Sequence, residues 1–352
     1  PIFGLFLSQV WTKVRRDRLK KSNILSGLVQ EKKSAPAIIK GLSDSKHLNI
    51  GIIGYGGRGG HLVRGAGFAT TGWTNTVSEN ARKNKLDKQF KTFMDQEDLN
   101  CSLVGVCDLF DVRAEQGLDA SQNEVRPGGK PKKTATRYRH YKDLLADDDI
   151  DAVIIATPDH WHSRITIDAA KAGKHVYCEK GLTRTFDETI EVYDAVKEAG
   201  ITFQLGHQNR QVEANEKAKQ IVQQGLLGTI NLVELTTNRN SPWGAWVWDI
   251  HPKGNAQTID WDTFQEPAPN KIPFGEEALK RFFRWRCWFD YGTGLSGDLL
   301  SHDFDAINQI MDLGIPKYSS STGGIYFYKD GRDVPDVWNA TFEYPDKDLT
   351  VL

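Results

Sequence analysis

The sequence predicts an α/β fold in which a doubly wound parallel sheet is followed by an α+β domain with a large open, mostly antiparallel sheet. Short apolar runs alternate with longer amphipathic runs from Leu48 onward, which is typical of parallel strands joined by crossover helices. A glycine-rich turn follows the first apolar run directly. From about residue 211 the pattern changes to long strand-like runs with few helices, which favours an open sheet that presents one face to a ligand.

The elements follow from this alternation. Each expected strand is a short apolar run, and each helix repeats apolar residues every three or four positions. In the first part we expect strands at Leu48–Ile53, Leu103–Cys107, Ala152–Ala156, His175–Cys178 and Thr202–Leu205, with the clearest helices at Ile165–Ala172 and Glu188–Ala199. In the second part we expect helices over Ala214–Gln224 and from near Gly297, and strands over Thr229–Asn238, around Gly324–Tyr328 and over Trp338–Tyr344.

The chain divides into three segments. A polar leader covers residues 1–46, a first domain covers residues 47–182 with a polar insertion at 70–100, and a second domain covers residues 183–352. Residues 15–21 of the leader, RRDRLKK, resemble a twin-arginine export signal in which Arg18 replaces the usual Phe. We therefore expect export to the periplasm; the alternative is a solvated basic leader on a cytoplasmic protein. Because the chain starts at Pro1 and ends in a strand-like run, we expect a fragment whose second domain is truncated at its C-terminus.

Composition excludes several classes of function. With 45 Lys and Arg against 46 Asp and Glu, the chain has no global field that would favour nucleic acid or an anionic membrane. No apolar run approaches the ~20 residues of a membrane span. The cysteines lack the spacing of a metal site, and most lie in apolar or aromatic surroundings, so we expect buried thiols. They are Cys101, Cys107, Cys178 and Cys287.

The glycine-rich turn is a candidate nucleotide site. Gly54, Gly56 and Gly59 have the G-x-G-x-x-G spacing of a Rossmann turn, with Gly57 and Arg58 between them. The first glycine permits a tight turn, the second lets backbone amides approach a pyrophosphate, and the third lets the helix pack on the strand. The N-terminus of that helix then attracts the anion. The spacing alone leaves a purely structural turn equally open, so the other strand ends must decide.

Asp108 ends the second expected strand. An acidic residue at this position accepts hydrogen bonds from the adenosine ribose and repels a 2′-phosphate, which favours NAD over NADP. The alternative is an N-cap for the helix that starts at Asp111.

The loop after the strand at 152–156 is expected to line the same crevice, because ligands bind beyond the carboxyl ends of an open parallel sheet. Its candidate cofactor-binding residues are Thr157, Pro158, His160 and His162. As an alternative, the histidines would be metal ligands, but no carboxylate or cysteine stands nearby at ligand spacing, and no metal is expected.

Glu179 and Lys180 end the next strand, where a lysine would lie near a nicotinamide; the alternative for Lys180 is an ordinary surface cation. Late in the chain, Asp298 and His302 are four residues apart and share one face of a helix. A carboxylate there orients an imidazole, and histidine is the natural base near neutral pH.

Tryptophan is concentrated between residues 243 and 288, mixed with charged residues such as Arg286. Flat aromatic faces with polar neighbours suit sugars, whereas Trp and Arg are also enriched at subunit interfaces, and both interpretations stay open. The tryptophans are Trp243, Trp246, Trp248, Trp261, Trp285 and Trp288. Asn209 and Arg210, which follow the strand at 202–205, are further candidates for substrate binding.

In their order and spacing, these motifs resemble the Gfo/Idh/MocA family of NAD(P)-dependent oxidoreductases. The resemblance covers the chain from about His47 to its end. It rests on GIIGYGGRGG at 51–60, ATPDHWH at 156–162, AGKHVYCEK at 172–180 and GDLLSHDFD at 297–305. It implies a Rossmann domain and a second domain whose sheet carries substrate and a subunit interface, and therefore a homo-oligomer, either a dimer or a tetramer. Gly181 stands where the family usually has proline.

The resemblance also implies catalytic roles. His302 would take a proton from a sugar hydroxyl as hydride leaves carbon, Lys180 would hold and polarise the same oxygen, and Asp298 would orient substrate and base. We therefore expect an NAD-dependent oxidoreductase that takes hydride from a secondary hydroxyl of a sugar, glycoside or polyol. The alternatives are a glycosidase that retains NAD and works by transient oxidation and elimination, and a binder without catalysis. The residues expected to hold substrate are Asn209, Arg210, Trp243, Arg286 and His302.

Overall fold

The first part of the chain folds around a six-stranded parallel sheet. The structure is a computed structural model that describes residues 47–239 and 241–352, so the expected export signal lies outside the described residues. The strand order is β3-β2-β1-β4-β5-β6, which is the doubly wound order of a Rossmann fold. The strands are β1 (Leu48–Ile53), β2 (Cys101–Cys107), β3 (Thr136–Tyr138), β4 (Ala152–Ile155), β5 (His175–Glu179) and β6 (Phe203–Gly206). The sheet thus continues past residue 182, where the sequence analysis ended the first domain.

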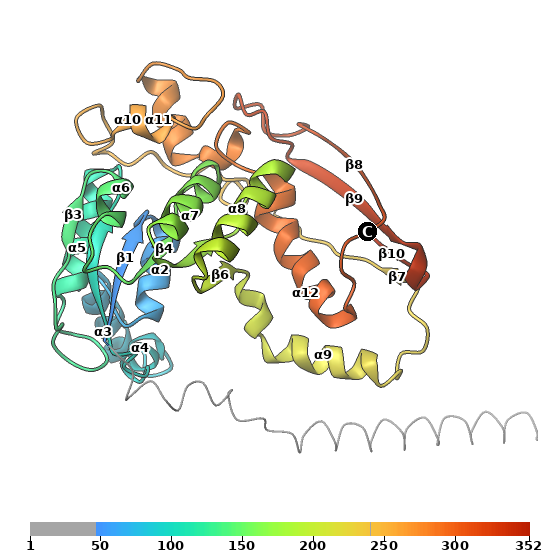
Figure 1. Cartoon of the computed structure of the whole chain (residues 1–352), viewed down its shortest axis with the longest axis horizontal. Coiled ribbons are helices and arrows are strands. Elements are labelled where there is room, and N and C mark those ends of the chain that lie inside the picture. Colours follow the sequence, from blue (N-terminus) through green and yellow to red (C-terminus); the bar gives the residue numbers. More distant parts are fainter. Residues whose placement is uncertain (1–46, 240) are drawn as a thin grey trace, which may run out of the picture.

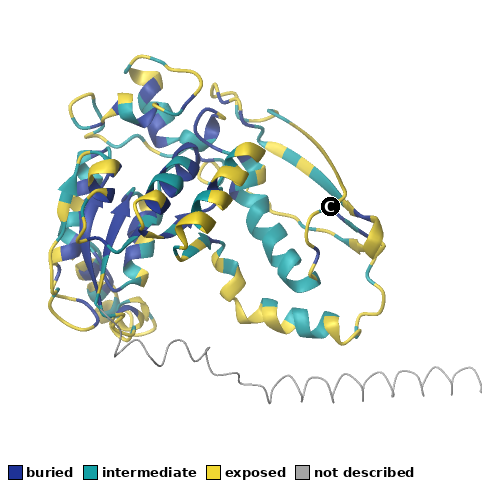
Figure 2. Ribbon diagram, in the orientation of Figure 1, coloured by how far each residue is buried: buried dark blue, intermediate teal, exposed yellow. Residues whose placement is uncertain are grey.

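Helices cover both faces of this sheet, and a separate hydrophobic core lies under each layer. Ile52, Val63 and Leu103 centre one core, and Leu144 and Ile165 centre the other. Figure 2 shows the strands as the most deeply buried part of the molecule. The helices are α2 (Gly57–Gly65), α3 (Thr71–Lys83), α4 (Gln89–Met94), α5 (Asp111–Gln122), α6 (Tyr141–Leu145), α7 (His162–Lys171) and α8 (Phe186–Ala199). The expected insertion at 70–100 thus contains α3 and α4.

The second part of the chain contains a four-stranded sheet with the order β7-β10-β9-β8. The β10–β7 pair is parallel and the other two pairs are antiparallel, so the fold class expected from the sequence is confirmed, with a mixed second sheet. Phe304 of α12 packs on Phe342 of β9. The elements are α9 (Glu213–Gln223), β7 (Leu232–Val233), α10 (Trp261–Phe264), α11 (Glu276–Phe283), α12 (Ser301–Met311), β8 (Tyr318–Gly324), β9 (Val337–Tyr344) and β10 (Leu349–Val351).

Two expected strands were wrong. The run Thr229–Asn238 forms only the two-residue β7, because β7 pairs solely with the end of the short β10. The strand around Gly324–Tyr328 is absent, since β8 ends at Gly324. After it, the Asp336 carboxylate accepts the backbone N–H groups of Tyr326, Phe327 and Tyr328 at 2.7–2.9 Å, which binds these residues into a turn.

An aromatic segment between β7 and α12 lies over the carboxyl end of the Rossmann sheet. Asp111 donates its N–H to Thr258 at 2.9 Å, and Asp260 donates to Leu109 at 2.9 Å, so the segment is pinned to the chain that leaves β2. Its buried core includes Trp261, Phe264 and Phe282. The segment therefore forms a roof above the strand ends that carry the predicted site (Figure 1).

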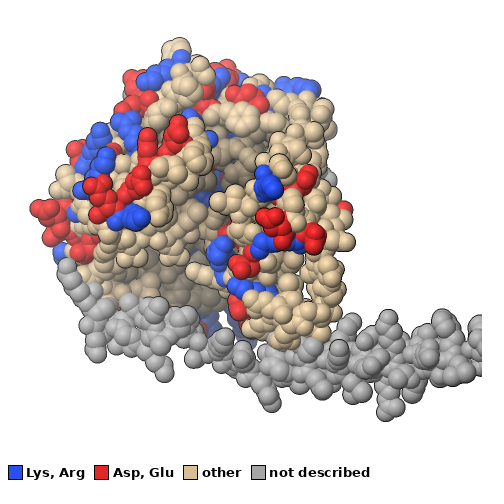
Figure 3. All heavy atoms as spheres, turned by 45° about the vertical axis from the view of Figure 1, so that its right-hand side comes forward, with Lys and Arg blue, Asp and Glu red and all other residues tan. Residues whose placement is uncertain are grey.

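The surface is mixed in charge, and the thiols are internal. Figure 3 shows cationic and anionic side chains interspersed on the face it presents. All four cysteines are buried and free, as expected from the sequence. In the part of the chain that the structure describes, no helix is both long and apolar enough to cross a membrane.

Candidate active site

The glycine turn joins β1 to α2 through contacts that exclude larger residues at two positions. Gly54 has φ +90°, and a Cβ there would lie 2.7 Å from the carbonyl oxygen of Ala156. A Cβ on Gly59 would lie 2.0 Å from the carbonyl oxygen of Gly54. Gly56 and Gly57 differ, because a Cβ on Gly56 has Arg113 at 3.8 Å as its nearest neighbour and one on Gly57 meets nothing within 4 Å. Two glycines thus build the turn, and two leave its outer surface open.

That open surface faces a cavity of about 510 Å³ between the carboxyl ends of the strands and the aromatic roof. The size is that of a small-molecule or cofactor site. Of the predicted site residues, those that line it are Gly54, Gly56, Gly57, Arg58, Asp108, Thr157, Pro158, Glu179, Lys180, Trp243 and Arg286. The glycine turn and the strand-end residues therefore meet at one place, whereas Asp298 and His302 are not among the residues that line the cavity.

Asp108 supports the turn from the end of β2. Its Oδ2 accepts the N–H of Tyr55 at 2.6 Å, and its Oδ1 accepts the N–H of Phe110 at 2.9 Å. Burial raises the pKa of this carboxyl, while the Arg113 guanidinium and the two N–H groups oppose that shift. The N-cap alternative was wrong, because Phe110 is the N-cap of α5. Each carboxylate oxygen keeps a second lone pair for a ligand in the cavity.

Arg58 and Glu179 link α2 to the end of β5. The Arg58 Nε lies 2.7 Å from Glu179 Oε1, and its terminal nitrogens contact His61 at 2.9 Å and Gln208 at 3.2 Å. Because Arg58 belongs to the glycine turn, this contact ties the turn to the end of β5. The pair fixes the backbone next to Lys180.

The two histidines of the 156–162 loop lie behind the cavity wall. His160 Nε2 lies 2.7 Å from the carbonyl oxygen of Phe264, and burial lowers the pKa of His160 to about 3. His162 bridges the carbonyl oxygens of Thr157 and Gly181, at 2.8 Å from each. Both therefore position backbone, and neither is brought to the cavity. Among the described residues, no cluster of three or more His, Cys, Asp or Glu side chains could hold a metal.

Lys180, Asp298 and Arg286 form a buried charge cluster at the cavity. The Lys180 Nζ lies 2.5 Å from Asp298 Oδ1 and 2.9 Å from the Asp298 carbonyl oxygen, and the Lys180–Gly181 peptide is cis. The Arg286 Nε lies 2.9 Å from the same Oδ1. The two cations hold the pKa of Asp298 well below its usual range in spite of burial, which acts in the opposite direction. The ammonium keeps one further donor for a ligand.

Asp298 and His302 follow one another along a continuous helical segment, a π-helical turn over Ser296–Leu300 that leads into α12. Burial and the charge of Lys180 lower the pKa of the His302 imidazole, so its neutral form is favoured. The Nδ1 of His302 is buried and has no hydrogen-bond partner within residues 47–239 and 241–352. A neutral, unengaged imidazole is suited to accept a proton.

The tryptophans divide into two groups. Trp243, Trp248 and Trp285 line the cavity, whereas Trp246, Trp261 and Trp288 are buried in the aromatic core. The Arg286 guanidinium stacks over Trp285 at 4.1 Å and faces Trp248 at 5.3 Å. The aromatic wall thus holds a cation next to the charge cluster.

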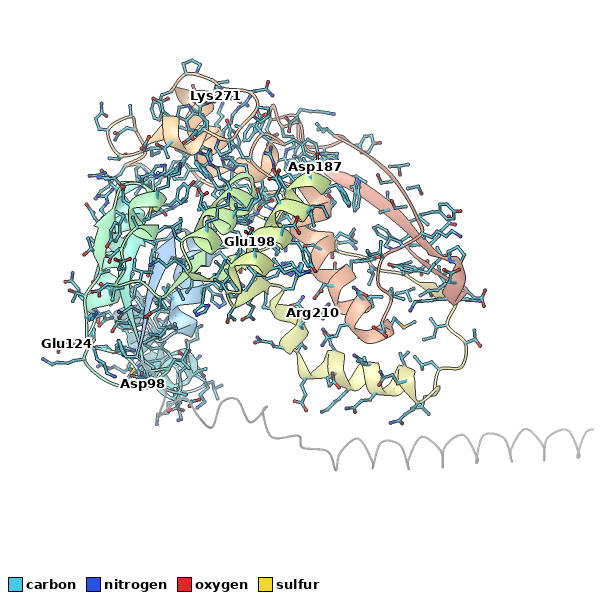
Figure 4. All side chains as sticks on the ribbon, viewed as in Figure 1. Asp98, Glu124, Asp187, Glu198, Arg210 and Lys271 are labelled. Carbon is cyan, nitrogen blue, oxygen red and sulfur yellow. The ribbon has the colours of Figure 1, made fainter. Side chains whose placement is uncertain are left out.

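Asn209 and Arg210 are not brought to the cavity. They lie in the 3₁₀ turn η3 (Gln208–Gln211), where the Arg210 Nε binds both carboxylate oxygens of Asp305 at 2.9 and 3.0 Å. Figure 4 labels Arg210 at the junction between the first sheet, α9 and α12. Sequence reasoning missed other residues that do line the cavity, namely Arg113, Asp159, Phe282 and Phe283. Trp248 and Trp285, which also line it, belong to the tryptophan cluster that the sequence analysis singled out.

Comparison with known proteins identifies the first domain. Residues 48–207 match the GFO_IDH_MocA family, described as an oxidoreductase family with an NAD-binding Rossmann fold. This match assigns residues 48–207 to the NAD-binding Rossmann domain of that family. In this family domain, the matched range ends at His207, just beyond β6.

Two curated relatives share parts of the sequence. An uncharacterized oxidoreductase of Bacillus subtilis is 40% identical over 102 residues, which cover 29% of this chain and 30% of that protein. Levoglucosan dehydrogenase of Pseudarthrobacter phenanthrenivorans is 29% identical over 194 residues, 52% of this chain and 41% of that enzyme. The matched segments thus cover less than half the length of each relative.

Solved structures share the fold. A levoglucosan dehydrogenase in complex with NADH and levoglucosan superposes with a TM-score of 0.55 at 21% identity, over 87% of this chain and 66% of that one. Myo-inositol 2-dehydrogenase from Lactobacillus plantarum gives a TM-score of 0.55 at 20% identity, over 87% of this chain and 69% of that one. The two-domain architecture is therefore shared with these two dehydrogenase structures.

Proposed function

We propose that this protein is an NAD-dependent oxidoreductase that removes hydride from a secondary hydroxyl of a sugar, glycoside or polyol. The observation that carries the proposal is that Lys180, which binds the Asp298 carboxylate, lines the same cavity of about 510 Å³ as the glycine turn. The dehydrogenases of levoglucosan and myo-inositol among the similar proteins support a carbohydrate or polyol substrate.

The cavity fits a dinucleotide. The open surface at Gly56 and Gly57 leaves room for a pyrophosphate beside the N-terminus of α2. The Thr157 Oγ1 is a buried hydroxyl oxygen that has no partner among the described residues, and Thr157 lines the same cavity. The carboxylate of Asp108 lies at the end of β2, where it would accept the ribose hydroxyls and disfavour a 2′-phosphate. These features support NAD rather than NADP.

In this proposed reaction, each polar group of the site has a specific role. A bound nicotinamide supplies a hydride acceptor. His302, neutral because burial and Lys180 lower its pKa, accepts the hydroxyl proton. Lys180 donates its remaining N–H to the substrate oxygen and stabilises the negative charge that develops there. Asp298 fixes Lys180 and Arg286, and Trp248 and Trp285 provide flat faces for the C–H groups of a sugar ring.

The alternative is a glycosidase that retains NAD and passes through the same oxidised intermediate. It is favoured by the roof, since Trp243 and Trp248 come from the second part of the chain and help to enclose the cavity in which the cofactor would stay. Incubation with NAD and a panel of polyols, free sugars and aryl glycosides separates the two. Stoichiometric formation of NADH supports the dehydrogenase, and aglycone release without net NADH overturns it in favour of the glycosidase. NAD binding with neither reaction overturns both.

We also propose a homo-oligomer that uses the second sheet. Along the edge strand β8 almost every residue is exposed, and Tyr318 at its start is 57% exposed. A long exposed edge strand invites pairing with another chain. Light scattering coupled to size exclusion tests this, and a monomer at all concentrations would contradict it.

A further inference from the structure

A second cavity, of about 920 Å³, lies next to the proposed active site. Arg58 lines both cavities. The second one is bounded by α2, by the α3–α4 insertion, by Tyr177 of β5 and by the end of β6, and its walls include His61, His207 and Gln208. His207 comes directly after β6, so the carboxyl end of the sheet's edge strand opens onto this cavity.

His207 connects this cavity to the proposed base. The imidazole rings of His207 and His302 are in edge-to-face contact, with centroids 5.8 Å apart and an interplanar angle of 82°. The Nε2 of His207 and the Nδ1 of His302 are both buried, and neither has a hydrogen-bond partner in the described part of the chain. Two unsatisfied ring nitrogens on touching imidazoles are uncommon, because buried polar atoms are usually paired.

The surroundings of the pair keep both rings neutral. Burial lowers the pKa of His207, Arg210 and Lys180 lower it further, and Asp305 and Glu179 raise it. Burial also lowers the pKa of His302, with Lys180 and His207 acting in the same direction and Asp298 and Glu179 opposing them. The far nitrogen of His207, Nδ1, lies 3.9 Å from Asp305 Oδ1. A neutral imidazole carries one donor and one acceptor, which is what a proton relay requires.

We propose that His207 carries the proton of the reaction from His302 to the water of the second cavity. The inference rests on the proposed function. Hydride leaves the substrate carbon with its electron pair for the nicotinamide, and the hydroxyl proton goes to Nε2 of His302. The Nδ1 proton of His302 passes to Nε2 of His207, directly or through one water. His207 then releases its Nδ1 proton to the cavity, so the reaction yields a carbonyl compound, NADH and one proton.

The relay is tested with His207→Gln, and His61→Gln serves as the matched control because His61 is a histidine of the same cavity. For His207→Gln we expect kcat to fall by about tenfold to a hundredfold, with KM and the NAD dissociation constant unchanged and a larger solvent deuterium isotope effect. For His61→Gln we expect wild-type values. Imidazole in the buffer restores turnover to His207→Ala, because the truncated side chain leaves a space that opens onto the cavity.

A second measurement does not depend on turnover. Ring ¹⁵N NMR titration of the wild type shows His302 coupled to His207, and His207→Gln raises the pKa of His302, since His207 lowers it in the native protein. A wild-type kcat and isotope effect in folded His207→Gln, or an unchanged His302 titration, overturns the relay. A wild type that forms no NADH with any substrate overturns the proposed function itself, and the coupled titration then still reports whether the two rings interact.

Discussion

Alanine substitutions in the glycine turn test whether the turn binds a nucleotide or has a purely structural role. Gly56 has φ −70°, and the nearest atom to an added Cβ is 3.8 Å away, so Gly56→Ala fits the folded protein. Loss of a favourable N-cap residue costs about 0.5 kcal/mol, and the reduced entropy of the unfolded chain returns about 0.4–1 kcal/mol. We therefore expect the free energy of unfolding to change by less than about 0.5 kcal/mol.

The same methyl group projects into the space that a pyrophosphate would occupy. We expect NAD affinity to fall by about tenfold to a hundredfold, or about 1.4–2.8 kcal/mol, measured by calorimetric titration beside urea unfolding. Gly72→Ala is the control, because its Cβ also meets nothing within 4 Å but lies on α3, away from the cavity. Unchanged NAD affinity in a stably folded Gly56→Ala protein would refute the assignment of this surface to the cofactor.

Gly59→Ala gives the opposite pattern. Its Cβ would lie 2.0 Å from the Gly54 oxygen, where real contacts stay beyond 3.0 Å, so α2 and the turn must separate by about 1 Å. Overpacking of this kind costs about 1–3 kcal/mol or more. We expect a lower unfolding midpoint as well as weaker NAD binding. A fully stable Gly59→Ala protein would contradict the packing described for the turn.

Three further predictions concern buried ionisable groups. Asp298→Asn removes the carboxylate that pairs with Lys180 and should lower the free energy of unfolding by about 3–5 kcal/mol at neutral pH. Because the pKa of Asp298 is depressed in the folded protein, the stability difference between wild type and variant should shrink as pH falls below the ordinary carboxyl range, as urea unfolding can show. Burial raises the pKa of Cys107 to about 12, so its thiol should resist alkylation at mildly alkaline pH until denaturant is added, as mass spectrometry can show. Asp108→Asn should reduce the preference for NAD over NADP, measured as the ratio of their dissociation constants; an unchanged ratio would contradict the ribose role.

Much of the first domain could be predicted from the sequence because its signals are local. Each buried strand is an apolar run, and polar residues such as Asp108, Thr157 and Lys180 follow immediately at the strand ends. The order of a parallel sheet brings those ends together without further information. The convergence of the motifs on one cavity follows from this topology.

The rest depends on contacts between distant segments. Arg113 sits on α5 with no motif around it, and it reaches the cavity because Phe282 and Phe283 of the roof stack against its guanidinium. The proposed role of His207 depends on its ring contact with His302 of α12, a helix that packs beside η3 only in the folded chain. The expected strand around Gly324–Tyr328 failed because the Asp336 carboxylate, eight to ten residues later in the chain, accepts the backbone N–H groups of that segment. Hydrogen bonds from side chains to backbone leave no periodic trace in a sequence.

The walls of the cavity come from both parts of the chain, so a bound ligand should hold the two parts together. The floor is built from strand ends of the Rossmann sheet, and the roof comes from Trp243 to Arg286 in the later part of the chain. A ligand that contacts both surfaces links them reversibly. At a ligand concentration one hundred times the dissociation constant, binding stabilises the folded protein by about 2.7 kcal/mol. Cofactor saturation should therefore protect the roof segment from proteolysis and from amide hydrogen exchange more strongly than it protects α9, which lies outside the cavity. Protection confined to the floor would mean that the roof does not close on the bound molecule.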